Sequence, residues 1–259
     1  MAIPILYKFF VFAFGAAVGS FLNVCIYRLP NSRSLIRPRS MCPQCGAPIP
    51  FYDNIPLVSY MVLRARCRNC SAVIPLRYPV VEAASGLFAV AIVMRYGLRW
   101  EALVLYAFVA ALLVVTFIDI DHQIIPNIIT YPGVVVGLAA SFFSEFITVK
   151  DAVLGIAVGA GILLVVALGY YLVTKNEGMG GGDVKLLAMI GAFLGWKAVI
   201  FTIFLGSAVG TLAGLAVALK SRKGRKTAVA FGPFLSLGAL LYIFYGPELI
   251  SWYVHLLGR

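Results

Sequence analysis

Charge is what this sequence has least of. Only 12% of its 259 residues are charged, and 62% are hydrophobic, whereas about a quarter of the residues in a soluble globular domain are charged. Apolar runs of roughly 18 or more residues recur along the chain, and a helix of that length crosses the hydrocarbon core of a bilayer. The composition therefore excludes an ordinary soluble domain and predicts an all-α polytopic membrane protein.

A signal-peptide cleavage site is also missing. The first apolar run begins almost at the N-terminus, but the stretch FGAAVGSFLNVCIYRLP contains no A-x-A site, so we expect a retained helix. The hydropathy pattern predicts about eight transmembrane helices, at residues 5–26, 79–96, 100–118, 128–147, 151–174, 184–199, 200–219 and 229–247. The stretch 184–219 is too long for one span, and we place a break near Leu194–Lys197.

The few charges are unevenly distributed. Eight spans put 15 of the 21 Lys and Arg residues on one side of the membrane, including the basic loop 220–226. Positive residues favour the cytoplasmic side, so we expect the side with 15 to be cytoplasmic and both termini to lie on the outer side. This topology accounts for the net charge of +11, and we expect the lipid bilayer, and no nucleic acid, as a partner.

Cysteines are scarce but clustered. Four of the five lie in a polar, proline-rich loop, as the pairs CPQC (Cys42, Cys45) and CRNC (Cys67, Cys70). Two C-x-x-C knuckles are typical of a tetrahedral zinc site, and metal can supply folding energy to a segment with little core. A redox dithiol usually has one such motif, and the reducing cytoplasm disfavours disulfides. We therefore predict structural zinc on these four cysteines.

The chain then divides into three predicted parts. Residues 1–27 form the first transmembrane helix, 28–78 a cytoplasmic zinc-binding domain, and 79–259 a seven-helix membrane domain. The fifth cysteine, Cys25, ends the first helix and is expected to be a small buried residue.

Acidic residues are few enough to be considered one by one. Ionisable groups inside a bilayer are costly, so each is a candidate functional residue. Six of the ten acids lie near helix ends or in loops and are expected to be solvated. The other four are Glu82, Asp119, Asp121 and Asp183.

Asp119 and Asp121 follow the third predicted span. Residues two apart on a helix point in different directions, so only one of them can face a given partner. Asp119 lies deeper, and Asp121 stands beside polar His122 and Gln123. We favour Asp119 for chemistry because a deeper acid is harder to explain as a solvated charge.

Asp183 follows a glycine-rich break, GMGGG, at the start of the sixth span. Glycine disfavours regular helix and permits close backbone approach. Irregular backbone at membrane depth must be buried in protein or line a water-filled cavity. An N-terminal cap would explain the aspartate, but it does not explain four glycines among five residues.

Two carboxylates at similar depth suggest two functions. Facing acids can share one proton, and the ionised acid can then activate a water for attack on a peptide carbonyl, as in an aspartic protease. A proton-coupled transporter would also place paired acids among its helices. Composition alone does not distinguish the protease from the transporter.

Five segments together resemble the bacterial type IV prepilin peptidases. They are GSFLNVCIYRLP, RYPVVEAASG, DIDHQIIPN, GGGDVKLLAMIGAFLGW and FGPFLSLGA, in that order and with the cysteine loop after the first. The segment Gly180–Asp183 also matches the GxGD signature of intramembrane aspartyl proteases. The resemblance covers nearly the whole chain.

The resemblance implies a bifunctional enzyme of the bacterial inner membrane, in which the expected outer location of both termini is the periplasm. Members cut the basic leader from prepilins and pseudopilins after a glycine, at the cytoplasmic face. They then methylate the new N-terminal residue, usually Phe, with S-adenosylmethionine. The resemblance places the catalytic dyad on Asp119 and Asp183, with Gly180 and Gly182 in the loop that supports Asp183. In the family, the position of Asp121 need not be acidic.

The methyltransferase site is less evident, because no Gly-rich fold of the soluble type is present. The cysteine loop with RYPVVE is the natural region. Glu82 is expected to pair with Arg77 or Arg28, or else to contact the substrate amine. A peptidase without methylation, and a transporter with a zinc-stabilised loop, remain as alternatives.

Overall fold

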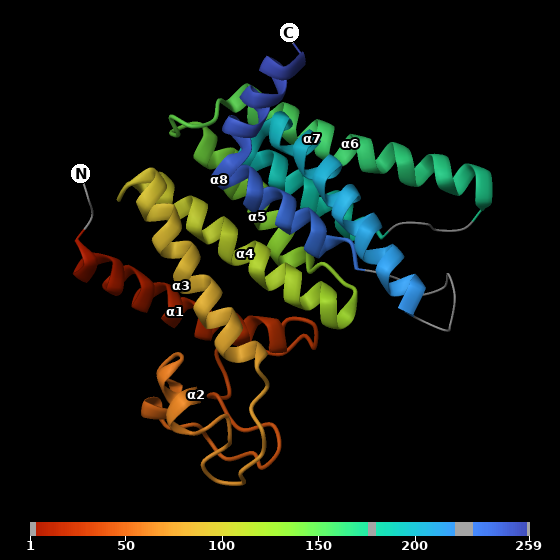
Figure 1. Ribbon diagram of the computed structural model, residues 1–259. Helices are drawn as coiled ribbons and strands as arrows, with labels where there is room; N and C mark the ends of the chain where they lie inside the picture. Colours follow the sequence, from red (N-terminus) through yellow and green to blue (C-terminus); the bar gives the residue numbers. More distant parts are fainter. Residues whose placement is uncertain (1–3, 176–179, 221–229, 258–259) are drawn as a thin grey trace. The chain divides into compact units, whose positions relative to one another are not determined.

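The computed structural model describes residues 4–175, 180–220 and 230–257, and this part of the chain is helical without a β-strand. Its α-helices, labelled in Figure 1, are α1 (Ile5–Arg28), α2 (Val58–Val62), α3 (Arg77–Tyr96), α4 (Trp100–His122), α5 (Asn127–Ser141), α6 (Val149–Thr174), α7 (Gly181–Lys220) and α8 (Gly232–Leu257). A short 3-10 helix, η1 (Phe51–Asn54), precedes α2.

The membrane character predicted from composition is confirmed by these helices. Five of those described are long and apolar enough to cross a bilayer, while α5 and the segment Gly232–Gly246 of α8 are apolar but shorter. The number of spans therefore stays a prediction. The break expected near Leu194–Lys197 is confirmed, because Gly195 has φ 81° and ψ 175° and separates α7 into two helical halves. Most of the basic loop lies outside the described residues.

The chain forms two units, Met1–Val114 and Val115–Arg259. They do not coincide with the three predicted parts, which stay a prediction. Each unit is held together by a close contact between antiparallel helices.

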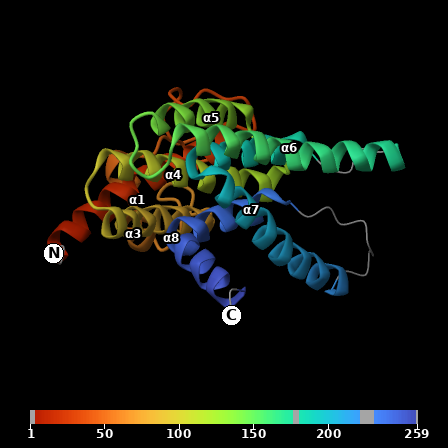
Figure 2. The ribbon, with the colours of Figure 1, turned by 90° about the horizontal axis from the view of Figure 1, so that it is seen from above.

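In the first unit, α1 packs along α3 through small residues (Figure 2). A Cβ placed on Gly15 would lie 2.8 Å from the Gly86 Cα, and one on Gly19 would lie 2.7 Å from the Glu82 Cα. The two pairs are one helical turn apart on both helices. Small residues at such spacing let membrane helices approach until backbone atoms touch. Glu82 is thereby fixed against α1.

In the second unit, α7 contacts α5, α6 and α8. Gly155 and Gly159 of α6 meet the backbone of Gly191 and Leu187, again in pairs one turn apart. The first half of α7 is the most enclosed helix of this unit, with fully buried side chains at Leu186, Leu187, Met189 and Ile190. Asp183 therefore lies in the first turn of the helix that contributes these buried side chains to the core of the second unit.

Candidate active site and metal centre

The four cysteines of the loop converge on one point. The sulfur atoms of Cys42, Cys45, Cys67 and Cys70 all lie within 4.8 Å of one another. None forms a disulfide, and the Cys42 and Cys70 sulfurs are 3.8 Å apart. Four convergent sulfurs are the donor set of a tetrahedral soft-metal site, so the cluster could hold a metal ion. The predicted gathering of these cysteines is confirmed.

Each C-x-x-C pair sits in the same kind of backbone turn. In the first, the Cys42 N–H donates to the Ala47 carbonyl at 2.9 Å, and in the second, the Cys67 N–H donates to the Ala72 carbonyl at 2.8 Å. The fourth residue after each leading cysteine has positive φ, 68° at Gly46 and 59° at Ser71. The left-handed residue reverses the chain and directs both sulfurs of a pair the same way.

The thiols differ in acidity. A hydrogen bond with the backbone of Ala47, helped by one from the Asn69 side chain, lowers the pKa of Cys45 to about 7. For Cys70 a backbone hydrogen bond at Ala72 acts in the lowering direction, but burial and the neighbouring thiols outweigh it and raise the pKa to about 11. A metal needs thiolates, so metal binding by this cluster depends on loss of the thiol protons.

An ion pair connects the second knuckle to η1. The Arg68 guanidinium donates to both carboxylate oxygens of Asp53, at 2.7 and 2.6 Å. This hydrogen-bonded pair holds the pKa of Asp53 below its usual value. The fork geometry orders the part of the loop between the two cysteine pairs.

Asp119 is buried at the end of α4. Its side chain is 5% exposed, and its Oδ2 accepts a hydrogen bond of 2.9 Å from the backbone N–H of Gly232 at the start of α8. Asp121 is exposed. The expectation that Asp121 is the more solvated of the two aspartates is therefore confirmed.

Asp183 lies in the first turn of α7 and is partly buried. Its carboxylate lies within electrostatic range of Asp119. Ile125 lies beside both, because a Cβ on Gly182 would be 3.0 Å from the Ile125 Cβ, and one on Gly232 would be 3.2 Å from its Cδ1. Three chain segments thus bring the two acids to one place.

The glycines before Asp183 have different surroundings. No described residue lies within 4 Å of a Cβ built on Gly180, whereas Gly182 packs against Ile125. Gly182 therefore permits a close contact with the chain that follows α4. Two residues beyond Asp183, the Lys185 ammonium donates to Asn127 Oδ1 at 2.8 Å, which ties the start of α7 to α5.

Glu82 is 8% exposed, and its Oε2 accepts a hydrogen bond of 2.8 Å from the backbone N–H of Leu57 in the cysteine loop. Leu57 has positive φ, and the carboxylate satisfies its amide. The Arg28 guanidinium, which we considered as a partner for Glu82, donates to the carbonyls of Ser34 and Pro38. Glu82 therefore anchors the loop to α3 through the backbone.

Two contributors to the aspartate site were not singled out from the sequence. Gly232 belongs to the segment FGPFLSLGA, which resembled a family motif without an evident role, and Ile125 belongs to DIDHQIIPN. Neither has a titratable side chain, and one acts through its backbone. The motifs were the available signal, but their meeting point depends on how α4, α7 and α8 pack.

Two family models match successive stretches of the chain. Residues 13–96 match the bacterial peptidase A24 N-terminal domain, and residues 106–215 match the type IV leader peptidase family. No solved structure matches the chain.

Several relatives carry the name prepilin leader peptidase/N-methyltransferase. The one from Aeromonas hydrophila is 36% identical over 97% of this chain and 95% of its own length. That from Pseudomonas aeruginosa is 35% identical, over 98% and 96% respectively. That from Myxococcus xanthus is 40% identical, over 86% and 67%.

The fold and the sites define a multi-pass membrane protein with a four-cysteine loop and a pair of adjacent aspartates at helix ends. The chain belongs to the type IV leader peptidase family, among the bacterial prepilin leader peptidase/N-methyltransferases.

Proposed function

We propose that this protein cleaves the basic leader from type IV prepilins and pseudopilins after a glycine, and then methylates the new N-terminal residue, usually Phe. Full-length similarity to relatives named for both activities supports this function. The site in the protein's own structure that supports the cleavage step is the pair Asp119 and Asp183.

The pair is suited to peptide hydrolysis. One carboxylate takes a proton from a water, whose oxygen attacks the scissile carbonyl carbon. The other, protonated, donates to the carbonyl oxygen, and the C–N bond then breaks as the leaving amine takes up a proton. The Gly232 N–H holds Asp119 in place.

The cysteine cluster is proposed to hold structural zinc. Its four convergent sulfurs fit the ion's tetrahedral preference, and the loop has few buried apolar residues of its own. A metal supplies the folding energy that such a segment lacks.

S-adenosylmethionine is proposed as the methyl donor, because the relatives are named N-methyltransferases. When bound, it supplies an electrophilic methyl group to a free amine. The protein's part is to hold the cofactor and to bring the amine to it.

Orientation follows from the charge distribution. The cysteine loop and the aspartate site are proposed to face the cytoplasm, with both termini in the periplasm. A prepilin is a hydrophobic helix with a basic cytoplasmic leader, so its scissile bond lies near the depth of helix ends such as those bearing Asp119 and Asp183.

One experiment tests the proposal as a whole. Purified protein in detergent is incubated with a prepilin and S-adenosylmethionine, and the product is analysed by intact mass and N-terminal sequencing. We expect loss of the leader after glycine and the gain of one methyl group. Cleavage without methylation would identify a peptidase alone, and an unprocessed prepilin would contradict the proposal and leave the transporter alternative.

A further inference from the structure

The chain before Asp183 does little to hold the direction of this carboxylate. Asp183 lies in the first turn of α7, directly after a glycine-rich stretch, and glycine leaves the backbone free to adopt many conformations. The N–H groups of a first helical turn also lack partners within the helix, and the Asp183 N–H makes a long bond of 3.3 Å to the Gly180 carbonyl. The direction of Asp183 therefore depends on contacts that the same turn makes with other segments.

Lys185, in the same turn, makes such contacts with α5. Its ammonium donates to Asn127 Oδ1 at 2.8 Å and lies 5.5 Å from the centroid of the Tyr131 ring. Asn127 and Tyr131 are one helical turn apart and are thus neighbours on one face of α5. A hydrogen bond and a cation–π contact together hold the ammonium at that face. We call these three residues the Lys185 clamp.

The clamp acts on the side of the turn that faces away from Asp183. Residues two apart on an α-helix differ in direction by about 200°, so Lys185 and Asp183 point to nearly opposite sides of α7. A Cβ on Gly182 would lie 3.0 Å from the Ile125 Cβ. The start of α7 is thus attached at two points to residues 125–127, the segment that joins α4 to α5. Two attachment points fix the rotation of the turn as well as its position.

We propose that Lys185 is a positioning residue for the aspartate pair. By holding the ammonium on Asn127 and Tyr131, the clamp sets the rotation of the first turn of α7 and so directs the Asp183 carboxylate toward Asp119. This role rests on the proposed peptidase function, because it concerns the geometry that the cleavage step requires. It also commits the Lys185 ammonium to α5, so this cation is not a binding group for the substrate.

Steady-state cleavage of a prepilin by the full-length protein in detergent tests the role. Lys185→Met keeps the length and the helix propensity of the side chain but removes the donor and the charge. The contact is solvent-exposed, and such contacts contribute little to stability, whereas small misplacements of a catalytic group slow a reaction strongly. We expect kcat to fall about three- to tenfold, with KM and the thermal unfolding midpoint unchanged. Lys185→Arg keeps a cation and a donor that can also stack on Tyr131, so kcat is expected to stay within about twofold of wild type.

The acceptor side of the clamp gives a second set of variants. Asn127→Leu removes the acceptor and is expected to lower kcat as Lys185→Met does, while Asn127→Asp keeps an acceptor and should cleave at a rate close to wild type. If both residues act through one contact, the double variant Lys185→Met/Asn127→Leu loses no more kcat than the larger single loss. Losses that simply multiply would show two independent effects and would overturn the proposal.

Lys197→Met is the matched control. Lys197 is an exposed lysine of the same helix, and its ammonium also lies over an aromatic ring, 5.8 Å from the centroid of Trp196. It lies beyond the break at Gly195, so its removal is expected to leave kcat at the wild-type value. Equal losses in Lys185→Met and Lys197→Met would indicate a general effect of charge and would overturn the positioning role.

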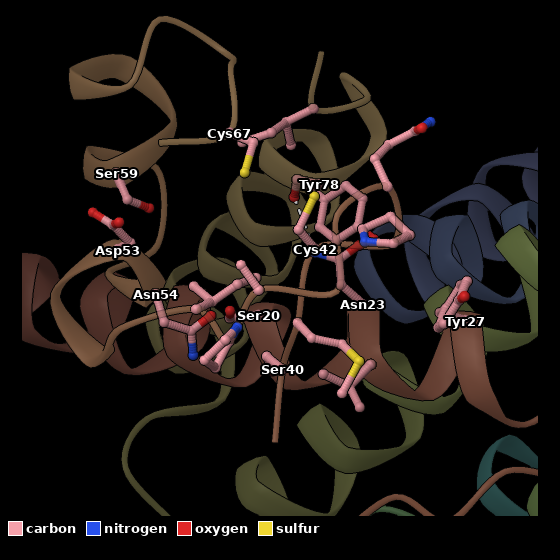
Figure 3. Close-up of a pocket in the computed structure, with 18 of the residues that line it drawn as sticks. Ser20, Asn23, Tyr27, Ser40, Cys42, Asp53, Asn54, Ser59, Cys67 and Tyr78 are labelled. Carbon is pink, nitrogen blue, oxygen red and sulfur yellow. Dashed lines mark hydrogen bonds between the residues drawn. The ribbon is translucent and has the colours of Figure 1, made fainter. Parts of the chain in front are cut away.

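The first unit serves as an internal reference for folding. Figure 3 shows Cys42 and Cys67 in the wall of a cavity whose lining residues all lie within 20–82, whereas the clamp belongs to the second unit. Zinc content, and the alkylation of these two cysteines in metal-free protein, are therefore expected to match wild type in every clamp variant. Loss of zinc together with cleavage would show a general folding defect and would overturn the local role.

Two further results would also overturn the proposal. A wild-type kcat in Lys185→Met would show that Asp183 keeps its direction without the clamp. A higher KM in Lys185→Met, with normal cleavage by Asn127→Leu, would assign the ammonium to substrate binding. Failure of the proposed function has a different signature, because a wild-type protein that leaves the prepilin uncut would remove the peptidase activity itself.

Discussion

The backbone N–H of Gly232 donates a 2.9 Å hydrogen bond to Oδ2 of Asp119, although 113 positions separate the two residues in sequence. A Cβ on Gly232 would lie 2.7 Å from that same oxygen. The hydrogen bond holds the Asp119 carboxylate in place, and the lack of a side chain on Gly232 leaves the space that this carboxylate occupies.

The first prediction concerns that carboxylate and its neighbour. Asp119→Asn and Asp183→Asn are each expected to reduce prepilin cleavage by at least about a hundredfold, because an amide cannot transfer the proton that the reaction requires. Leader removal is followed by gel shift and intact mass.

Asp121→Asn is the control for these variants, because it makes the same change on an exposed residue of the same helix. It is expected to cleave at a rate close to wild type. Equal losses in Asp119→Asn and Asp121→Asn would contradict the assignment of the dyad.

Gly232→Ala tests the contact described above. The added methyl group must displace Asp119 or Ile125, and small misplacements of a catalytic group can cost on the order of a hundredfold in rate. We expect the rate of cleavage to fall at least about tenfold while the protein stays folded.

The matched control is Gly161→Ala in α6, where no residue of the described part of the chain lies within 4 Å of the new Cβ. Because alanine is the better helix former, this variant should cleave normally and be at least as stable as wild type. A Gly232→Ala enzyme with the wild-type rate would show that the site tolerates the displacement.

The contact between α6 and α7 is predicted to be important for stability. A Cβ on Gly155 would collide with the backbone of Gly191, and backbone cannot move aside as a flexible side chain can. Gly155→Ala should lower the free energy of unfolding by roughly 1–3 kcal/mol. Thermal unfolding in detergent measures this against Gly161→Ala, and a midpoint equal to that of the control would refute the close approach.

The cysteine loop is predicted to bind one zinc ion per chain and to lose it in Cys42→Ser. In metal-free protein, the thiols should alkylate in an order set by their pKa values. Cys45, with a pKa of about 7, is mostly thiolate at pH 8, while Cys70, with a pKa of about 11, is almost entirely protonated.

Iodoacetamide labelling followed by peptide mass spectrometry gives the rates. The Cys45 rate should rise through half its maximum near pH 7, and Cys70 should label more slowly than Cys45. Bound zinc should protect all four cysteines. Similar rates at Cys45 and Cys70 without metal would contradict the predicted difference in acidity.

Much of the fold and part of the site could be predicted from local sequence. Apolar runs of membrane-spanning length determine where helices form, and the paired C-x-x-C spacing determines which cysteines converge, because both depend on neighbouring residues. Glycine after Leu194 similarly indicated the break within α7. The depth of Asp119 relative to Asp121 was readable for the same reason.

Tertiary structure decided which distant groups meet. The Gly232 amide on Asp119, Ile125 between two glycines, and the Leu57 amide on Glu82 each join segments far apart in the chain. Two of these are hydrogen bonds from a backbone N–H to a carboxylate, and no side-chain pattern encodes the backbone donor. The sequence by itself determined the helices and the candidate acids, and the packing of those helices decided their partners.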